Sequence, residues 1–278
     1  MSDPKKPFPA LSPAQRLYLD VHGYVVIEEA LTSSEVARLC DKLYEIERVY
    51  RQTGALPDTH CHFSSTAEDF FRVDNLPHLA PCFFEYLTHP RLLGMVEEIT
   101  GGNVRLEQSD AHIRRPTSPE KQRYGFHRGM DVGMSYVKNG LYYCPFVKTL
   151  TNLTDLGPDD GGTAVIDGSH KLDVEAQAII DAAMADPRMI HQVVAPAGST
   201  LLFFESLIHS SGIIRSGRDR LLIIGGYTPS MFQAWRGYDP HPDFAQAQEE
   251  ATRSLLTGDR KYHWDRRLRR LSDPVAEG

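Results

Sequence analysis

The chain has 278 residues, 41% of them hydrophobic and 24% charged, which is the composition of an ordinary folded protein. Its formal net charge of −7 argues against a nucleic-acid polymer as partner. No apolar run reaches the roughly 20 residues that a membrane span needs. The start, "MSDPKKPFPALSPAQ", has lysines but no apolar stretch after them, and the four cysteines lack CxxC spacing. We therefore expect a cytoplasmic protein with reduced thiols.

The first hundred residues are mainly helical in pattern. Residues 12–20 predict a short helix, and "GYVVIEEAL" predicts a β-branched strand that follows it. In "TSSEVARLCDKLYEIERVYRQ" the apolar residues recur at helical spacing, and Ser33 or Ser34 can cap the helix. Residues 51–70 predict an irregular loop, and "HPRLLGMVEEITGG" predicts another helix.

From about residue 103 the pattern changes to short strands separated by turns. Turn signals such as "GPDDGG" punctuate seven or eight strands, and a helical insert over roughly residues 173–185 interrupts them. This pattern predicts an antiparallel sandwich or jelly roll. We expect one domain over residues 1–278, mainly β with flanking helices. It would have a helical part over about 1–102, a jelly-roll core over about 103–230 and a helical tail over about 231–278.

Two histidines in the strand-rich region stand out by their surroundings. His127 and His209 each lie in a predicted strand and are followed closely by small residues, Gly129 after the first and Ser211 after the second. Arg220 begins the predicted strand "RLLIIGGY" beyond the second histidine. A neutral imidazole is a good ligand for Fe(II), and a guanidinium fork binds a carboxylate through two hydrogen bonds. Taken singly, a histidine in a strand more often serves packing or the surface.

Three segments in chain order carry a resemblance to a known family. "DVHGYVVIEEALTSSEVARL" is similar to its opening strand and helix, and "FVKTLTNLTDLGPDDGGTAVIDGSHK" is similar to its central strand and acidic turn. "AGSTLLFFESLIHSSGIIRSGRDRLLIIGGYTP" is similar to the segment with its distal metal histidine. From about residue 18 to residue 229 the chain thus resembles the phytanoyl-CoA dioxygenase family of Fe(II)/2-oxoglutarate oxygenases.

The resemblance implies a fold, cofactors and residue roles. The fold is a double-stranded β-helix, the cupin-like jelly roll, and the reaction uses Fe(II), 2-oxoglutarate and O2 as an oxidoreductase. His127 matches the proximal metal ligand and His209 the distal one. Arg220 matches the arginine that holds the C5 carboxylate of 2-oxoglutarate, and Ser211 matches a hydroxyl that assists there. His170, in "GSHK", is expected to set a turn and not to bind metal.

The chain departs from the family at the carboxylate ligand. The family motif is His-x-Asp, whereas this sequence reads His127-Arg128-Gly129. Residues i and i+2 of a strand share one face about 6.6 Å apart, which lets such a pair bind one ion. Asp131 lies on the same face but about 13 Å from His127 in an extended chain. It can coordinate iron only where the chain bulges or turns, which Gly129 and Gly133 would permit.

Two readings of this departure lead to different reactions. In Fe(II)/2-oxoglutarate halogenases, which this motif resembles, glycine or alanine replaces the carboxylate and a halide takes its place. Gly129 in that position predicts a chlorinase that uses chloride and acts on an unactivated C–H bond of a small molecule in secondary metabolism. The alternative is a hydroxylase of the phytanoyl-CoA dioxygenase type in which Asp131 is the iron carboxylate ligand or water takes that position. A third reading is a non-catalytic binding protein that has lost its metal, which the joint presence of His127, His209 and Arg220 disfavours.

The substrate is suggested only by residues before the first metal histidine. Arg114, Arg115 and Arg123 form a basic cluster, and Phe126 could stack on an aromatic base. If these residues line the pocket, they favour a phosphorylated small molecule such as a nucleotide, which halogenases of this kind are known to accept. The alternative is an ordinary solvated strand edge and loop.

Overall fold

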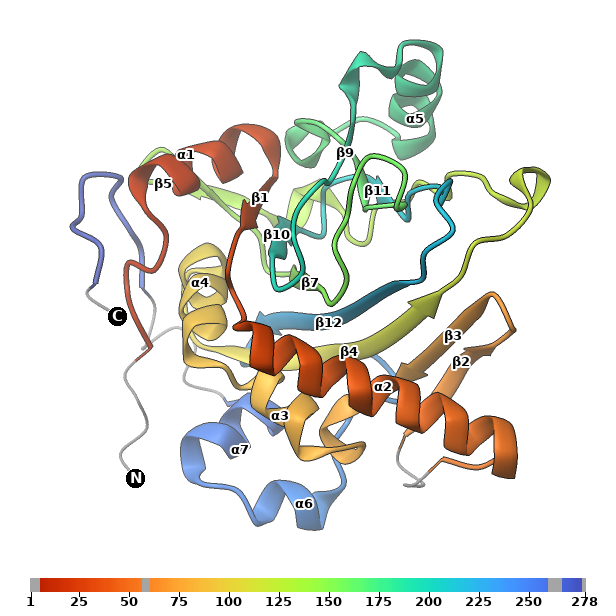
Figure 1. The fold of residues 1–278 in the computed structure, drawn as a ribbon. Coiled ribbons are helices and arrows are strands. Elements are labelled where there is room, and N and C mark those ends of the chain that lie inside the picture. Colours follow the sequence, from red (N-terminus) through yellow and green to blue (C-terminus); the bar gives the residue numbers. More distant parts are fainter. Residues whose placement is uncertain (1–5, 57–60, 260–266, 277–278) are drawn as a thin grey trace.

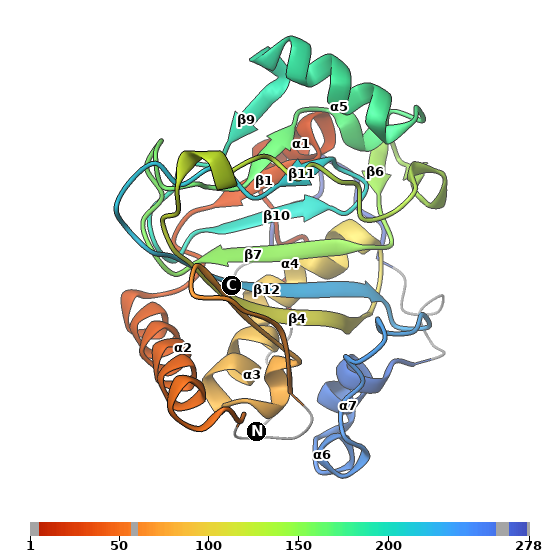
Figure 2. The same ribbon diagram turned by 90° about the vertical axis from the view of Figure 1, so that its right-hand side faces the viewer.

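A seven-stranded antiparallel sheet forms the centre of the computed structural model, which describes residues 6–56, 61–259 and 267–276. Its strands lie in the order β1-β10-β7-β12-β4-β3-β2 (Figure 2). The bounds of these seven strands are β1 Tyr24–Ile27, β2 His62–Thr66, β3 Phe70–Asp74, β4 Val104–Arg114, β7 Val147–Asn152, β10 Thr200–Phe204 and β12 Arg220–Pro229.

A second, smaller sheet faces the first and completes the jelly roll (Figure 1). It has the order β11-β8-β9, and a separate ribbon pairs β5 with β6. The bounds of these strands are β5 Tyr136–Lys138, β6 Leu141–Tyr143, β8 Ala164–Ile166, β9 Ile190–Gln192 and β11 His209–Ser210. The predicted fold class, mainly β with flanking helices, is confirmed.

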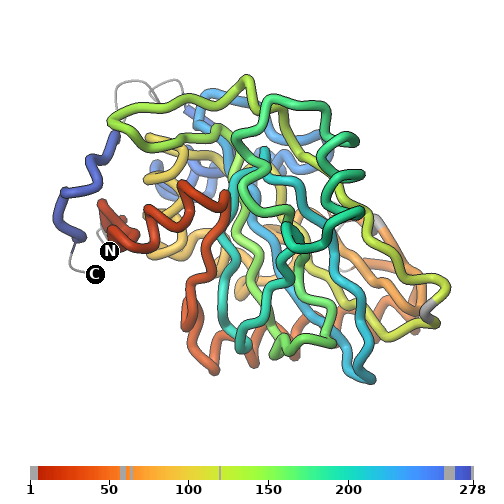
Figure 3. The backbone as a smooth tube through the Cα atoms, turned by 90° about the horizontal axis from the view of Figure 1, so that it is seen from above, coloured from red at the N-terminus to blue at the C-terminus, as the bar shows by residue number. Residues whose placement is uncertain are grey.

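Helices cover the outer face of the large sheet and the end of the small one. In Figures 1 and 2, α2, α3 and α4 lie against the large sheet, whereas α5 lies beyond the small sheet. The C-terminal segment 267–276 runs beside the residues that precede α1 (Figure 3), where the Ala276 N–H donates to the Pro9 carbonyl over 3.0 Å. The helices are α1 Pro13–His22, α2 Ser33–Thr53, α3 Pro81–Leu87, α4 Pro90–Thr100, α5 Ala176–Ala185, α6 Pro242–Gln246 and α7 Glu250–Thr257.

Alternation along the long strands gives the large sheet two chemically different faces. On β4, Ala111 and Ile113 join the hydrophobic core under the helices. Their neighbours Asp110 and His112 point to the opposite face, toward the small sheet, where a cavity lies. β12 follows the same rule, with Ile223 in the core and its neighbours on the cavity side. The period-2 pattern therefore places polar side chains in a cavity lined by both sheets.

Several sequence predictions need correction at this level. The strand predicted in "GYVVIEEAL" is confirmed as β1, which pairs with β10. The N-terminal part also contains the hairpin β2–β3, which was not predicted and extends the large sheet beyond β4. β2 lies within residues 51–70, which were predicted to be a loop. Helix α2 is capped by Thr32 in a reciprocal capping box with Glu35, one residue before the predicted caps. The predicted insert helix is confirmed as α5.

Two expectations from composition can be compared with the described residues. None of the four cysteines, all of which lie in the described ranges, forms a disulfide, in agreement with the prediction of reduced thiols. Over the ranges that the structure describes, no helix combines the length and the apolar character needed to cross a membrane.

Candidate active site

One cavity of about 350 Å³ opens between the two sheets and contains the four residues with the predicted metal and co-substrate roles. Both sheets and the loop around Gly129 contribute to its wall. The volume suits a small ligand. The lining residues are Phe70, Arg72, Gln108, Asp110, His112, His127, Gly129, Lys148, Leu150, Thr163, Phe203, Glu205, His209, Ser210, Ser211, Arg220, Leu222, Ile224 and Trp235.

His127 and His209 are brought together by their backbones. Each donates its N–H to the other's carbonyl over 3.0 Å, so that the two residues form an isolated antiparallel bridge. Side chains of directly opposed residues share one face of such a pair. The ring centroids accordingly lie 4.3 Å apart. Phe203 packs edge-on against the His209 ring with a centroid distance of 4.8 Å, which restricts its rotation.

The hydrogen bonds of both rings fix their tautomers. Nδ1 of His127 lies 3.0 Å from the Gly125 carbonyl, and Nδ1 of His209 lies 3.0 Å from the Leu207 carbonyl. A carbonyl can only accept, so each Nδ1 carries the proton and each Nε2 keeps its lone pair. Metal-binding histidines are typically oriented in this way. Burial lowers the pKa of His209 below its ordinary value, although the Glu205 carboxylate opposes the shift. The lowered pKa favours the neutral ring.

Arg220 lines the same cavity and has no acidic partner among the residues that the structure describes. Its side chain is buried, and Nη2 donates to Oγ1 of Thr163 over 2.9 Å. Nε and Nη1 are buried without a hydrogen-bond partner among the described residues. Burial and the nearby Arg114 lower the pKa of Arg220 to about 9, so the group is still charged at neutral pH. A carboxylate ligand would satisfy both the charge and the unpaired donors.

The position of the missing carboxylate is occupied by another side chain. A Cβ atom added to Gly129 would overlap Oε2 of Glu205 and would lie 2.6 Å from Cδ of the same residue. Glu205 directly follows β10, and its carbonyl accepts hydrogen bonds from the N–H groups of Gly129, over 2.9 Å, and Met130, over 3.3 Å. The space beside Gly129 is therefore not open as the sequence predicted, because the Glu205 carboxylate lies in it.

Lys148 provides the positive charge next to this carboxylate. Its Nζ lies 3.7 Å from Oε1 of Glu205, hydrogen-bonds to Glu107 and lies 2.6 Å from Oε1 of Gln108. Lys148 and Glu107 are both buried. The two nearby carboxylates raise the pKa of Lys148 against the opposing effect of burial, so it remains a cation.

The residues present fit a divalent metal with nitrogen ligands in two positions. Two neutral imidazoles with free Nε2 lone pairs suit Fe(II), and O2 could reach the pair because His127 is the more exposed of the two. As the side chains stand, no three His, Cys, Asp or Glu side chains within the described ranges converge on one point as a ready ligand cluster. The histidine pair could supply two protein ligands to such a metal.

Asp131, the alternative carboxylate ligand, is not brought to the cavity. Its side chain is exposed and accepts a hydrogen bond from the Gly133 N–H over 2.7 Å, which caps the 3₁₀ turn Val132–Met134. The chain does turn after His127, as coordination by Asp131 would require. The Asp131 carboxylate, however, accepts a backbone hydrogen bond within that turn and does not face the cavity.

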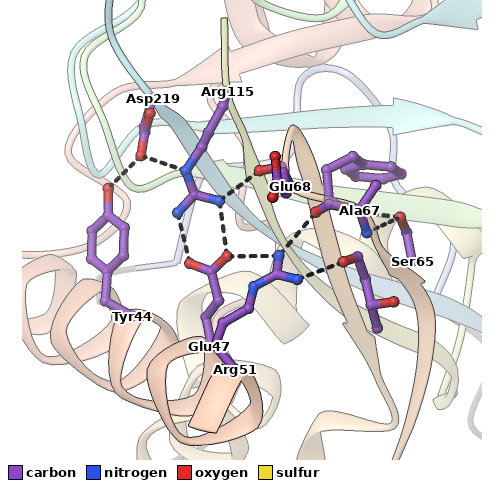
Figure 4. A network of polar contacts seen from close by, with 10 residues as sticks. Tyr44, Glu47, Arg51, Ser65, Ala67, Glu68, Arg115 and Asp219 are labelled. Carbon is purple, nitrogen blue, oxygen red and sulfur yellow. Dashed lines mark hydrogen bonds and ion pairs between the residues drawn. The ribbon is translucent and has the colours of Figure 1, made fainter. Parts of the chain in front are cut away.

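The basic cluster before His127 does not line the cavity either. Arg115 belongs to a surface network instead, in which it makes two hydrogen bonds to Glu47, over 2.8 and 2.7 Å, and an ion pair with Asp219 over 3.5 Å (Figure 4). Arg114 lies over the Phe70 ring at 5.4 Å. Arg123 is exposed.

Phe126 is turned away from the cavity, where it stacks on Tyr124 at 5.0 Å and packs against the core cluster around Ile166. Ser211, by contrast, lines the cavity beside the second histidine. The placement of Phe126, together with that of the arginines, removes the support for a phosphorylated substrate.

The structure adds polar groups that the sequence did not single out. Arg72 reaches the cavity from β3 and pairs with Asp110 over 3.0 Å and with Asp74 over 2.8 Å. Burial and the neighbouring Asp74 raise the pKa of Asp110, while Tyr238 donates to it over 2.6 Å. Alternation on β4 could have placed Asp110 and His112 on one face, but only strand pairing shows that Arg72 lies beside them.

The fold and this site agree with the comparison to protein families. The phytanoyl-CoA dioxygenase (PhyH) family matches residues 19–222, most of the chain, and the protein belongs to this family. It is an oxidoreductase of the Fe/2-oxoglutarate-dependent oxygenase class.

The individual relatives and solved structures that resemble the chain share about a quarter of its residues or fewer. An uncharacterised protein of Mycobacterium tuberculosis is 26% identical over 216 residues, 77% of this chain and 74% of that protein. Ectoine dioxygenase of Streptomyces coelicolor is 23% identical over 153 residues, 55% of this chain and 49% of its own. HygX of Streptomyces hygroscopicus, solved with nickel and 2-oxoglutarate, superposes with a TM-score of 0.66 at 25% identity, covering 81% of this chain and 90% of HygX. HygX has also been solved with hygromycin B bound.

Proposed function

We propose that the protein oxidises an unactivated C–H bond of a small polar molecule, with 2-oxoglutarate as co-substrate and O2 as oxidant. The observation that carries this proposal is the combination, in one cavity, of two tautomer-fixed histidines and a buried arginine with unpaired donors. Bound Fe(II) would couple the decarboxylation of 2-oxoglutarate to oxidation of the substrate. His127 and His209 would hold the metal, and Arg220 would bind the far carboxylate of the co-substrate.

The cavity wall supports a polar substrate. Arg72, Gln108 and Asp110 supply donors and acceptors on one side, and Trp235, of which 51% is exposed, stands at the rim. Such groups would orient a substrate through hydrogen bonds. The binding of hygromycin B to HygX supports a polyfunctional small molecule as a starting point for substrate screening.

Oxygen transfer is favoured over halide transfer by what lies beside Gly129. A halide would need the space in which the Glu205 carboxylate lies, and two anions there would repel each other. We therefore infer hydroxylation, or a related oxidation, as the outcome in the wild-type protein.

Halogenation remains the second candidate function because of one observation, the glycine itself. Gly129 offers no ligand of its own, and Lys148 would stabilise chloride if Glu205 turned away. The proposals differ in the mass of the product, since hydroxylation adds oxygen from O2 whereas chlorination replaces hydrogen with chlorine.

The test of the common proposal needs no substrate. Fe(II), ascorbate and 2-oxoglutarate are supplied under air, and release of succinate is measured for the wild type and for His209→Ala. We expect slow succinate formation that depends on iron and on His209. Equal succinate formation by both proteins would refute the proposal.

A further inference from the structure

We propose that Glu205 supplies the carboxylate ligand of the metal in place of the residue that the His-x-Asp motif normally provides. The inference rests on the proposed function, because it assumes a metal between His127 and His209. It differs from both other interpretations of the motif, which place a halide beside Gly129 or use Asp131 as the ligand.

Backbone pairing puts Glu205 on the correct side of the site. The segment 127–129 runs antiparallel to the segment 205–209. His127 and His209 are hydrogen-bonded at one end of this pairing, and the Gly129 N–H donates to the Glu205 carbonyl at the other. Residue 129 lies two positions after His127, and both residues line the same cavity. The Glu205 carboxylate reaches that face from the neighbouring segment, because its oxygen overlaps the point at which a Cβ of residue 129 would lie.

The glycine and the glutamate are complementary. Any side chain at residue 129 would collide with Oε2 of Glu205, so the longer side chain fits only because residue 129 has none. Glutamate also has one methylene more than aspartate. This extra length lets the Glu205 carboxylate reach the site although its Cα lies on the segment that pairs with residues 127–129. A carboxylate oxygen thus lies at the point where a Cβ of residue 129 would be, although it comes from a different position in the chain.

The ion pair between Glu205 and Lys148 holds the Glu205 carboxylate only loosely. The ligand cluster is not closed as the side chains stand, and Oε1 of Glu205 points to Lys148 at 3.7 Å, beyond hydrogen-bonding distance. Lys148 keeps Glu107 and Gln108 as hydrogen-bond partners if Glu205 turns toward the histidines. The turn therefore leaves no buried charge without a partner.

Charge also favours a carboxylate as the third ligand. Two neutral histidines leave both charges of a divalent metal uncompensated, and Lys148 adds a further positive charge nearby. Within the cavity Glu205 is the acidic side chain closest to Gly129, whereas Asp110 is already engaged by Arg72 and Tyr238. Coordination by Glu205 would lower the net charge of the site.

Metal affinity tests the proposal without relying on turnover. Co(II) is titrated into the metal-free full-length protein, and its dissociation constant and visible absorption are measured for the wild type, Glu205→Gln and Glu205→Asp. We expect both variants to bind Co(II) at least about tenfold more weakly, as loss of a supporting group alone costs that much. Glu205→Asp keeps the charge beside Lys148 but shortens the reach, so a purely electrostatic role would leave its affinity near that of the wild type.

A double variant returns the carboxylate to the family's position. Gly129→Asp with Glu205→Ala removes the overlap and restores the His-x-Asp motif, and we expect its Co(II) affinity to exceed that of Glu205→Ala by at least about tenfold. Asp131→Asn is the matched control and should bind Co(II) like the wild type. Circular dichroism and thermal melting establish that each variant is folded.

The outcomes separate this inference from the proposed function. Wild-type affinity in Glu205→Gln or in Glu205→Asp overturns the ligand role, and so does a folded double variant that binds no better than Glu205→Ala. If His127→Ala loses Co(II) while the Glu205 variants keep it, only the inference fails. If the wild type binds no Co(II), or if His127→Ala binds it equally well, the proposed metal centre itself is wrong.

Discussion

Arg220 donates one hydrogen bond to Thr163, from Nη2 to Oγ1 over 2.9 Å, and leaves Nε and Nη1 buried without a partner among the described residues. Unpaired donors on a buried cation are costly, so their persistence in a cavity indicates a site for an anion. The hydrogen bond to Thr163 therefore fixes Nη2 of the Arg220 guanidinium, while Nε and Nη1 can donate to a ligand.

The first prediction concerns binding of 2-oxoglutarate. Arg220→Gln should raise the dissociation constant of 2-oxoglutarate by about a hundredfold, because hydrogen bonds to a charged partner contribute roughly 1.5–3 kcal/mol each. Calorimetric titration measures the effect. Arg115→Gln is the matched control, since it breaks the Glu47 contacts on the surface and should leave 2-oxoglutarate binding unchanged. Equal binding by Arg220→Gln and the wild type would contradict the assignment.

The second prediction concerns chloride. Chloride should leave the visible spectrum of the Co(II) protein unchanged in the wild type, because the Glu205 carboxylate lies beside Gly129. In Glu205→Ala the same space is open, and chloride should shift the spectrum. Sodium sulfate at equal ionic strength is the control for general salt effects. A chloride-dependent shift in the wild type would instead support the halogenase.

The third prediction concerns the pH dependence of stability. Burial and the neighbouring Lys171 lower the pKa of His170 to about 4, whereas the unfolded chain takes up this proton near its ordinary value of about 6.5. Stability should therefore fall as the pH drops from about 6.5 toward 4, by roughly 1.4 kcal/mol per pH unit, and His170 should contribute no such slope above about 6.5.

Denaturant unfolding at pH 7.5 and pH 5 measures this contribution. In His170→Gln the amide can still donate to the Asp20 carbonyl, which Nε2 of His170 contacts at 3.1 Å, but it does not titrate. The variant should lose about 2 kcal/mol less stability than the wild type between the two conditions. If both proteins lose the same amount, His170 is not the source of the slope.

The fourth prediction compares two glycines that end helices. Gly23 after α1 and Gly54 after α2 have φ values of +86° and +71°. A Cβ on Gly23 would lie 2.5 Å from Nδ1 of His170 and 2.9 Å from Cδ1 of Leu207, whereas one on Gly54 would meet nothing within 4 Å.

Both alanine variants carry the backbone cost of a left-handed residue, but only one also has a steric clash. Gly54→Ala should lower the free energy of unfolding by about 1 kcal/mol, and Gly23→Ala by about 2 kcal/mol more. Chemical denaturation compares them directly. Equal losses would mean that the packing of His170 against Gly23 adjusts without cost.

Part of the candidate site could be assigned from the sequence through the family resemblance. The segments that contain His127, His209 and Arg220 resemble those of the phytanoyl-CoA dioxygenase family, and the structure places all three residues in one cavity. Arg114, Arg115, Arg123 and Phe126 were assigned to the substrate by their closeness to His127 in the chain. Adjacent residues of a strand point to opposite faces, however, and Arg115 is directed to Glu47 on α2.

The sequence by itself determined the fold class, the histidine pair and the absence of a carboxylate at residue 129. Only the tertiary structure decided what takes its place, since pairing between distant segments brings Glu205 against Gly129 and no local pattern encodes which residues meet. The same pairing leaves Asp131 as the cap of a surface turn. The family resemblance thus identified the two candidate metal histidines, and long-range strand contacts determined which other residues share their cavity.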